Sequence, residues 1–265
     1  MRHTRFTTVN NSANDKSELR RTNMTGSERN QNSFYSKVVM GEHGSTPPVI
    51  HRAQAKLVSK VKNSSETTRL LDIGSGAGVG AELIAKTVGI THVSCIDISI
   101  PALREVRNRG FSPLVASAEG LRLPFPDHTF DIVVLDEVIE HLVDTDSIMA
   151  EIHRVLKRDG QLLMSTPNLA AWFNRIALLF GIQPAFSEVS FKKVYGRPGS
   201  GLVGHLRLFT RKALIEFVND KGFKVRHAVG VPFPELPRFV RPLDVLLSKI
   251  PSLAGGSVII ADRLS

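Results

Sequence analysis

Short apolar runs alternate with amphipathic stretches along most of this chain. The apolar runs have strand-like lengths and lie at residues 70–73, 91–97, 111–117, 131–135, 161–166, 222–230 and 256–264. Apolar residues recur at helical spacing in residues 49–61, 79–88, 101–109, 146–158 and 211–221. Strands that alternate with helices predict an α/β fold with a doubly wound, mostly parallel sheet. The run DIVVL at 131–135 is apolar at nearly every position, so we expect this strand to be buried on both faces.

Capping residues mark several helix boundaries. Ser99 and Thr210 each stand just before a predicted helix, where a hydroxyl can accept a hydrogen bond from the first turn. For the helix predicted at 146–158, we expect Gly160 to close the end after two basic residues, which suit the negative end of the helix dipole.

Three segments do not fit the alternation. Residues 1–33 are rich in Asn, Ser, Thr and Arg and lack apolar periodicity, which predicts a disordered basic tail before one folded domain at 34–265. The segment at about 169–208 is much longer than the dozen or so residues that a compact crossover needs, so we expect a lid or substrate insertion there. A second amphipathic insertion is predicted at about 232–252.

Both insertions carry apolar residues at helical spacing. In the first, these residues are Trp172, Phe173, Ile176, Leu179 and Phe180. In the second, they are Leu236, Val240, Leu243, Leu247 and Ile250, beside Arg238, Arg241 and Lys249. The second stretch has two interpretations, core packing with a solvated basic face or contact with a membrane surface, and core packing is favoured. Its apolar run is too short and interrupted to span a bilayer.

Composition and charge fit one soluble globular domain with an uneven charge distribution. The chain has 265 residues, 42% of them hydrophobic, and a net charge of +9. Residues 70–167 hold eight basic and fourteen acidic residues (net −6), whereas residues 168–265 hold fourteen basic and six acidic residues (net +8). The basic segments that flank residues 70–167 favour binding to an anionic substrate, a membrane surface or nucleic acid. A role in solubility alone explains these basic residues about as well.

The chain shows no sign of secretion, disulfide bonding or metal binding. Its single cysteine, Cys95, lies in an apolar strand pattern and cannot form an internal disulfide. There is no secretory h-region, so we expect a cytoplasmic protein, with peripheral membrane contact left open. The nine histidines show no metal-site spacing, so no metal is expected.

The stretch Leu70 to Gly78, LLDIGSGAG, carries the clearest chemical signal. A strand ends at Ile73 and a helix follows Gly78, and the glycines between them let the backbone pass close to a ligand. Asp72 precedes the first glycine, and Asp97 ends the next strand. Carboxylates repel phosphates, so this turn suits a positively charged ligand better than a pyrophosphate. The GxGxG spacing also differs from the GxGxxG of nicotinamide cofactor sites.

At these residues the sequence resembles the class I S-adenosylmethionine-dependent methyltransferases of the small-molecule-type branch. Leu-Pro-Phe at 123–125 matches a signature of that branch, and RVLKRDG at 154–160 corresponds to its usual RVLKPGG. The resemblance runs from about Gly41 to the C-terminus. It implies a Rossmann-like sheet of seven strands whose last strand is antiparallel. It also implies S-adenosyl-L-methionine as cofactor, a molecule with a sulfonium and an ammonium but no phosphate.

The resemblance assigns cofactor residues to the strand ends. Asp97 stands where the ribose diol binds, and the junction at 117–119 stands where the adenine binds, with Ser117 in place of a frequent Asp. The predicted cofactor-binding residues are Asp72, Gly74, Ser75, Gly76, Gly78, Asp97, Ile98, Ser117, Ala118, Glu119 and Asp136.

Catalytic candidates follow the fourth predicted strand. Glu137, Glu140 and His141 should face the reaction centre, because ligands bind outside the carboxyl ends of such strands. His141 is the preferred general base for a hydroxyl acceptor, with Glu137 and Glu140 competing for that task or orienting it. The simpler alternative is that Glu140 and His141 only end the strand and pack under the lid. The Asn/Asp/Ser-Pro-Pro-aromatic motif of enzymes that methylate planar amines is absent here.

The acceptor follows less directly from the sequence. Trp172, Arg175, His205 and Arg207 are the substrate candidates, with core packing as the alternative for Trp172 and a surface ion pair for Arg175. The leading function is methyl transfer to a small-molecule hydroxyl on a glycan, a lipid-linked compound or a secondary metabolite. Two further properties of this small-molecule acceptor stay open, a negative charge and a link to lipid. An RNA- or protein-directed methyltransferase, and a non-catalytic cofactor-binding partner subunit, remain as alternatives.

Overall fold

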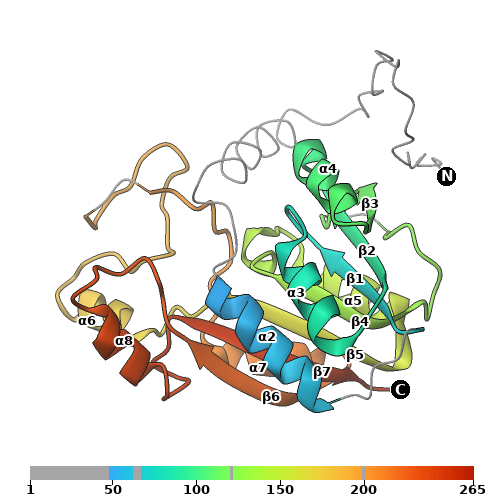
Figure 1. Ribbon diagram of the computed structural model, residues 1–265. Coiled ribbons are helices and arrows are strands. Elements are labelled where there is room, and N and C mark those ends of the chain that lie inside the picture. The colour runs from blue at the N-terminus through green and yellow to red at the C-terminus, as the bar shows by residue number, and fades with distance from the viewer. Residues whose placement is uncertain (1–47, 62–66, 120–121, 199–200) are drawn as a thin grey trace.

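A computed structural model of the protein describes residues 48–61, 67–119, 122–198 and 201–265. These residues form a seven-stranded sheet with the order β3-β2-β1-β4-β5-β7-β6 (Figure 1). The predicted tail at 1–33 lies outside the described residues.

The strands coincide closely with the predicted apolar runs. Their bounds are β1 Arg69–Ile73, β2 His92–Asp97, β3 Ser112–Val115, β4 Phe130–Asp136, β5 Leu156–Pro167, β6 Phe223–Val231 and β7 Gly256–Arg263. The first five strands pair in parallel, and β7 runs antiparallel between β5 and β6. The predicted Rossmann-like sheet with an antiparallel last strand is thereby confirmed.

Helices cover both faces of the sheet (Figure 1). Their bounds are α2 Pro48–Val61, α3 Val79–Val88, α4 Ile100–Asn108, the 3₁₀ turn η1 Ile139–His141, α5 Thr145–Val155, α6 Trp172–Leu179, α7 Arg211–Asp220 and α8 Arg241–Leu247. Helices α2, α3 and α4 pack in one hydrophobic cluster, and α5 and α7 pack in the other. The side chains of Ser99 and Thr210 cap α4 and α7 as predicted.

The end of α5 differs from the prediction. The helix stops at Val155 instead of continuing to residue 158, and Gly160 lies inside β5 instead of closing the helix. Leu156 is buried in extended conformation and pairs with Phe130 of β4. The backbone pairing and the burial of Leu156 therefore end the helix earlier than its helical spacing predicts.

Helices α6 and α8 have a polar interior. The buried side chain of α6 is Asn174, which accepts from the Ala185 N–H at 2.8 Å and donates to the Leu169 carbonyl at 3.0 Å. A buried side chain of α8 is Asp244, which accepts from Trp172 Nε1 at 2.8 Å and from the Phe233 N–H at 2.7 Å. The hydrogen bond between Trp172 and Asp244 joins the two helices, and the other bonds hold the two polar side chains against neighbouring loops.

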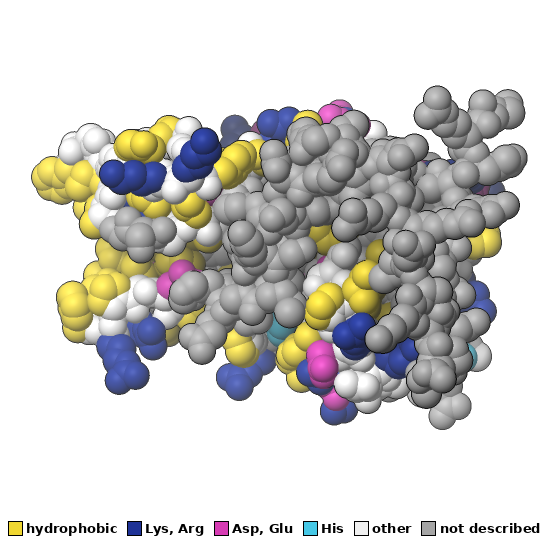
Figure 2. Space-filling view, turned by 90° about the horizontal axis from the view of Figure 1, so that it is seen from above, with side chains coloured by type: hydrophobic (Ala, Val, Ile, Leu, Met, Phe, Trp, Pro, Cys, Tyr) yellow, Lys and Arg dark blue, Asp and Glu magenta, His cyan; other side chains and the backbone are white. Residues whose placement is uncertain are grey.

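Their apolar side chains point outward as a result. Leu179 is 79% exposed, Phe180 73% and Phe239 86%. Leu243 and Ile250 are also exposed, whereas Leu236, Val240 and Leu247 are half-buried, so the expected core packing of the second insertion is met only in part. We call the exposed side chains of Ile176, Leu178, Leu179, Phe180, Phe239, Leu243, Leu246 and Ile250 the α6–α8 surface. Figure 2 shows hydrophobic side chains beside Lys and Arg at the left end of the molecule, where Figure 1 places these helices. Within the described part of the chain, no helix is long and apolar enough to cross a bilayer.

Candidate functional site

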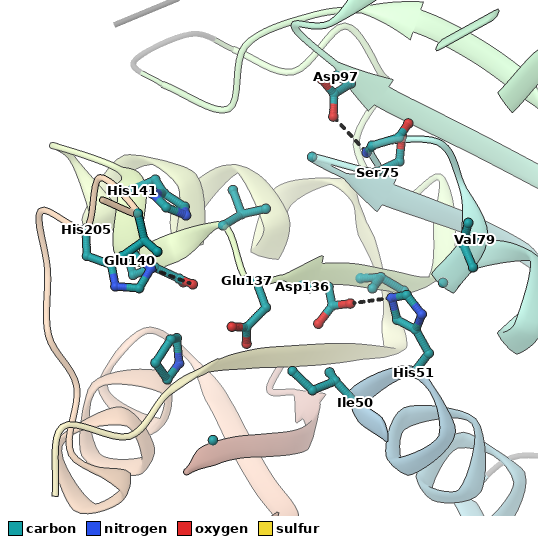
Figure 3. Close-up of a pocket in the computed structure, with 18 of the residues that line it drawn as sticks. Ile50, His51, Ser75, Val79, Asp97, Asp136, Glu137, Glu140, His141 and His205 are labelled. Atoms are coloured by element: carbon teal, nitrogen blue, oxygen red, sulfur yellow. Dashed lines mark hydrogen bonds and ion pairs between the residues drawn. The ribbon is translucent and has the colours of Figure 1, made fainter. Parts of the chain in front are cut away.

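A cavity of about 880 Å³ lies at the carboxyl ends of β1, β2 and β4 (Figure 3). Its wall also contains residues of α2, of the long segment between α6 and α7, and of the loop that follows β6. Doubly wound sheets bind ligands at such strand ends, and the volume is typical of a cofactor or substrate pocket.

The glycine turn shapes one end of the cavity. Gly74 and Gly76 line it, and both have positive φ angles, 71° and 50°. The N–H groups of Gly74 and Ser75 donate to the Ile96 carbonyl at 2.8 and 3.1 Å, which fixes the turn against β2. Gly78 lies just behind the wall, where it is the N-cap of α3 in left-handed conformation.

Replacing Gly74 by alanine is expected to lower the free energy of unfolding by about 2–5 kcal/mol. About 1–2 kcal/mol comes from the left-handed conformation, and about 1–3 kcal/mol comes from overpacking. A Cβ at Gly74 would lie 2.4 Å from Cγ2 of Val138. Urea denaturation with an unchanged m-value measures the loss.

Two further variants separate these contributions. Gly89 has a φ of 72°, and a Cβ there would meet nothing within 4 Å, so Gly89→Ala should show only the conformational cost. Adding Val138→Ala to Gly74→Ala should make the combined loss smaller than the sum of the single losses, because the clash is relieved. Equal losses at Gly74 and Gly89 would contradict the proposed clash.

Asp97 fastens the glycine turn from β2. Its Oδ2 accepts from the Gly76 N–H at 2.8 Å, and its Oδ1 accepts from the Ser99 N–H at 2.7 Å. The carboxylate is buried and lines the cavity (Figure 3). Burial raises the pKa of Asp97, and the backbone N–H groups that it accepts from oppose this rise.

The predicted adenine end is also part of the wall. Ile98, Ser117, Ala118 and Glu119 all line the cavity. The Glu119 carboxylate accepts from the Val143 and Asp144 N–H groups, each at 3.0 Å, so it also holds the chain that follows η1.

Helix α2 reaches Asp136 at the end of β4. Gln54 Nε2 donates to Asp136 Oδ1 at 2.9 Å, and His51 Nε2 lies 3.2 Å from Asp136 Oδ2. Ser165 Oγ also donates to Asp136. His51 is buried, and both it and the Asp136 carboxylate that it pairs with line the cavity. The sequence pattern does not predict a site role for Gln54. The signal that could have identified it is an amide side chain among the apolar positions of α2.

Acidic side chains dominate the cavity wall. Among the described residues that line it, eight are Asp or Glu, whereas Arg197 is the single Lys or Arg. Burial raises the pKa of Asp72 well above its usual range, and the negative charges of Asp136 and Asp97 raise it further. A cationic ligand would relieve this repulsion, whereas a phosphate would add to it.

Glu137 and Glu140 bring two more carboxylates together beyond Asp136. Glu137 has a positive φ of 54°, an uncommon conformation for a residue with a side chain, and its Oε1 accepts from Ser165 Oγ at 2.7 Å. Glu140 is buried, and its Oε2 accepts from Thr166 Oγ1 at 3.1 Å. Burial raises the pKa of Glu137 well above its usual range and that of Glu140 to about 8.

Two histidines complete this end of the cavity. His141 Nδ1 lies 3.2 Å from the Gly204 carbonyl, and His205 Nδ1 lies 3.2 Å from the Phe186 carbonyl. The two ring centroids are 4.8 Å apart. Burial lowers the pKa of His141, and burial together with the His141 charge lowers that of His205 to about 3.

Of the four predicted substrate residues, only His205 lines the cavity. Trp172, Arg175 and Arg207 lie outside its wall. Trp172 donates to Asp244, and Arg175 donates to the carbonyls of Ala170 and Ser252. Arg207 donates to the Val143 carbonyl at 2.6 Å. Trp172 and Arg175 therefore fasten α6 to α8 and the chain that follows it. Arg207 fastens the segment before α7 to the chain that follows η1.

Known proteins share the fold and part of the sequence. Residues 71–164 match a family model described as a methyltransferase domain. Over 99 residues the chain is 40% identical to a "Probable S-adenosylmethionine-dependent methyltransferase" of Mycobacterium tuberculosis (strain CDC 1551 / Oshkosh), which covers 37% of this chain and 35% of the relative. Over 124 residues it is 35% identical to the glycine/sarcosine/dimethylglycine N-methyltransferase of Actinopolyspora halophila, which covers 44% of this chain and 21% of the relative.

The chain thus spans only about a fifth to a third of the length of these two relatives. Among solved structures, a chain in the complex between the Haloferax volcanii Trm112 methyltransferase activator and a methyltransferase is similar in fold, with a TM-score of 0.61. The two chains are 16% identical, and the match covers 87% of this chain and 98% of that one.

Proposed function

We propose that the protein is a class I S-adenosylmethionine-dependent methyltransferase that transfers a methyl group from this cofactor to a hydroxyl of a small lipid-linked acceptor. The match of residues 71–164 to a methyltransferase domain supports this proposal. One observation carries the proposal. A single cavity contains the glycine turn with Asp97 at one end and the cluster of Glu137, Glu140 and His141 at the other. A cofactor on the glycine turn would direct its reactive methyl toward this cluster.

The reaction that we propose is an in-line displacement. The acceptor oxygen attacks the methyl carbon, the carbon–sulfur bond breaks, and its electron pair returns to sulfur to give a neutral thioether. The hydroxyl proton passes to a carboxylate. The sulfonium methyl is already activated, so alignment in the cavity supplies most of the acceleration. Well-aligned intramolecular reactions reach effective molarities of about 10⁵–10⁸ M.

Glu137 is the residue that we propose for the proton. Figure 3 shows its side chain between those of Glu140 and Asp136, facing the cavity. Burial and the charges of these two acids raise the pKa of Glu137, which strengthens it as a proton acceptor. Burial lowers the pKa of His141, so the charged imidazolium is disfavoured there. These contacts favour Glu137 over His141, which the sequence alone favours as the base.

The charge of the wall supports a neutral acceptor group. Arg197 is the single Lys or Arg among the described lining residues, and it lies 3.9 Å from the Glu188 carboxylate. An anionic acceptor would enter a wall of like charge. A hydroxyl carries no charge until it transfers its proton, so it avoids this cost.

The α6–α8 surface supports the lipid-linked part of the proposal. Exposed apolar patches in soluble proteins mark interaction sites. Lys192, Arg238, Arg241 and Lys249 are exposed in the same two segments, where Glu235 is exposed and Asp244 is buried. Apolar side chains among cations suit the interface of an anionic lipid membrane. The loop that leads to α8 and the segment that follows α6 both also line the cavity, so binding there would bring the cavity close to lipid.

The double variant Leu179→Ser and Phe239→Ser is expected to bind lipid vesicles at least tenfold more weakly than the wild type, because two highly exposed apolar side chains are lost. Co-sedimentation with mixed phosphatidylglycerol and phosphatidylcholine vesicles measures this effect. Leu264→Ser is the control, since Leu264 is exposed but lies near the C-terminus, away from α6 and α8 (Figure 1). Membrane binding would be contradicted if the wild-type protein did not co-sediment with vesicles. Self-association or binding of another protein through this surface would then be its function.

Incubation with methyl-labelled cofactor and a fractionated extract tests the function as a whole. We expect label in the lipid fraction, bound through a base-stable ether. Label in RNA or protein would overturn the proposal in favour of a macromolecular acceptor. Cofactor binding without label in any fraction would favour the non-catalytic partner subunit.

A further inference from the structure

Glu140, His141 and His205 form a compact group at the acceptor end of the cavity. Glu140 and His141 belong to η1, and His205 comes from the segment before α7, 64 residues after His141. One ligand-type atom from each residue lies within 4.8 Å of the others. All three residues line the cavity, and Figure 3 shows their side chains together.

Glu140 has a buried oxygen that needs a partner. The residue is 2% exposed, and its Oε2 accepts from Thr166. Its Oε1 is buried without a hydrogen bond, and His205 Nε2 lies 3.9 Å away, too far to donate one. An unsatisfied buried carboxylate oxygen is costly, and an ion is one of the few partners that explain it.

Backbone carbonyls orient both histidines. The Nδ1 atoms of His141 and His205 each contact a carbonyl oxygen, which can only accept, so each Nδ1 carries a proton. In a neutral imidazole the lone pair then lies on Nε2. For His205 this atom is the one nearest to Glu140 Oε1. Metal-binding histidines are held in this way, with the second ring nitrogen donating to a carbonyl or a carboxylate.

We propose that Glu140, His141 and His205 bind one divalent first-row transition-metal ion. Two imidazoles and one carboxylate are a ligand set of catalytic zinc sites, and imidazole also suits iron, cobalt and nickel. Three protein ligands leave coordination positions open. Because the ligands line the cavity, an open position would face the acceptor. The carboxylate charges of Glu140 and nearby Glu137 would balance the ion.

The ion would bind and orient the acceptor oxygen. Only this role rests on the proposed function, since the site itself stands on its three ligands. A hydroxyl oxygen bound to the ion would be held for attack on the methyl carbon, and its proton would pass to Glu137 as described above.

Cobalt binding to the full-length, untagged protein tests the site without any acceptor. After treatment with a chelator and dialysis, Co²⁺ is added while the visible absorption of the bound ion is followed, and Zn²⁺ and Mn²⁺ are titrated by calorimetry. We expect one equivalent to bind. Glu140→Gln, which keeps the shape of the side chain, and His205→Ala should each weaken binding at least tenfold. His227→Ala removes an exposed histidine outside the cavity and should leave binding unchanged.

The outcomes separate the metal site from the methyl transfer. No stoichiometric binding by the wild type, or an unchanged affinity in Glu140→Gln, overturns the site. Calorimetry with S-adenosylmethionine shows whether each variant is folded. If His205→Ala does not fold, the near-isosteric Glu140→Gln alone tests the metal site. If the protein binds the metal but transfers no label to any extract fraction, the metal site is supported and the proposed methyl transfer is contradicted. Full transfer by metal-free protein overturns the role of the ion.

Discussion

Glu137→Gln is expected to lower kcat by about 10²–10⁴-fold, the usual contribution of a positioned proton acceptor. The amide keeps the size of the side chain and can still accept from Ser165 Oγ, which lies 2.7 Å from Glu137 Oε1. It cannot take the proton from the acceptor hydroxyl. Initial rates with the acceptor found in the labelled extract, beside calorimetry with S-adenosylmethionine, measure the change.

The pattern of change distinguishes this role from a structural one. Cofactor affinity should stay within a few-fold of the wild type, because Glu137 lies at the other end of the cavity from Asp97 (Figure 3). Glu216→Gln is the control, since Glu216 is exposed on α7 and lies outside the cavity. Wild-type kcat in Glu137→Gln would exclude the proton role of Glu137.

Asp97→Ala is expected to weaken S-adenosylmethionine binding at least a hundredfold, about 2.8 kcal/mol at about 1.4 kcal/mol per factor of ten. The change removes the carboxylate that we propose to bind the ribose diol. It also removes the acceptor for the Gly76 and Ser99 N–H groups, and hydrogen bonds to a charged group contribute about 1.5–3 kcal/mol each. Isothermal titration calorimetry measures the affinity.

Two comparisons make this result specific. Asp220→Ala removes an exposed acid at the end of α7 and should leave cofactor affinity unchanged. A parallel titration with NAD tests the charge argument, because the acidic wall should reject a phosphate-bearing ligand. Heat from NAD and none from S-adenosylmethionine would contradict the proposed cofactor site. Wild-type affinity in Asp97→Ala would contradict the assignment of Asp97 alone.

The sequence predicts the sheet and the glycine turn because both depend on local signals. The apolar runs alternate with helical stretches, and each strand must bury its own side chains, so the pattern reports the fold directly. The turn from Gly74 to Gly78 is predictable for the same reason, since positive φ angles favour glycine and the neighbouring strand and helix are adjacent in sequence. The end of α5 is an exception, because the pairing of Leu156 with Phe130 depends on a strand far along the chain.

Tertiary structure alone decided the polar contacts of the site. Gln54 and Asp136 are 82 residues apart, and only the packing of α2 against the sheet brings Gln54 Nε2 within 2.9 Å of Asp136 Oδ1. His205 reaches Glu140 and His141 only because the segment before α7 folds back over the cavity, where the N–H groups of Leu206 and Arg207 donate to the Glu140 carbonyl. The spacing of residues along the chain does not predict contacts between such distant pairs.

The orientation of α6 and α8 shows the same limit. Helical spacing reveals that each helix has an apolar side, but it does not reveal which side faces the protein. Asn174 and Asp244 are satisfied by partners that only the folded chain supplies, so these polar residues are buried and the apolar side is left exposed. The sequence by itself determined the fold and the glycine turn. The folded chain decided the partners of the buried polar groups, because hydrogen bonds between distant segments exist only after packing.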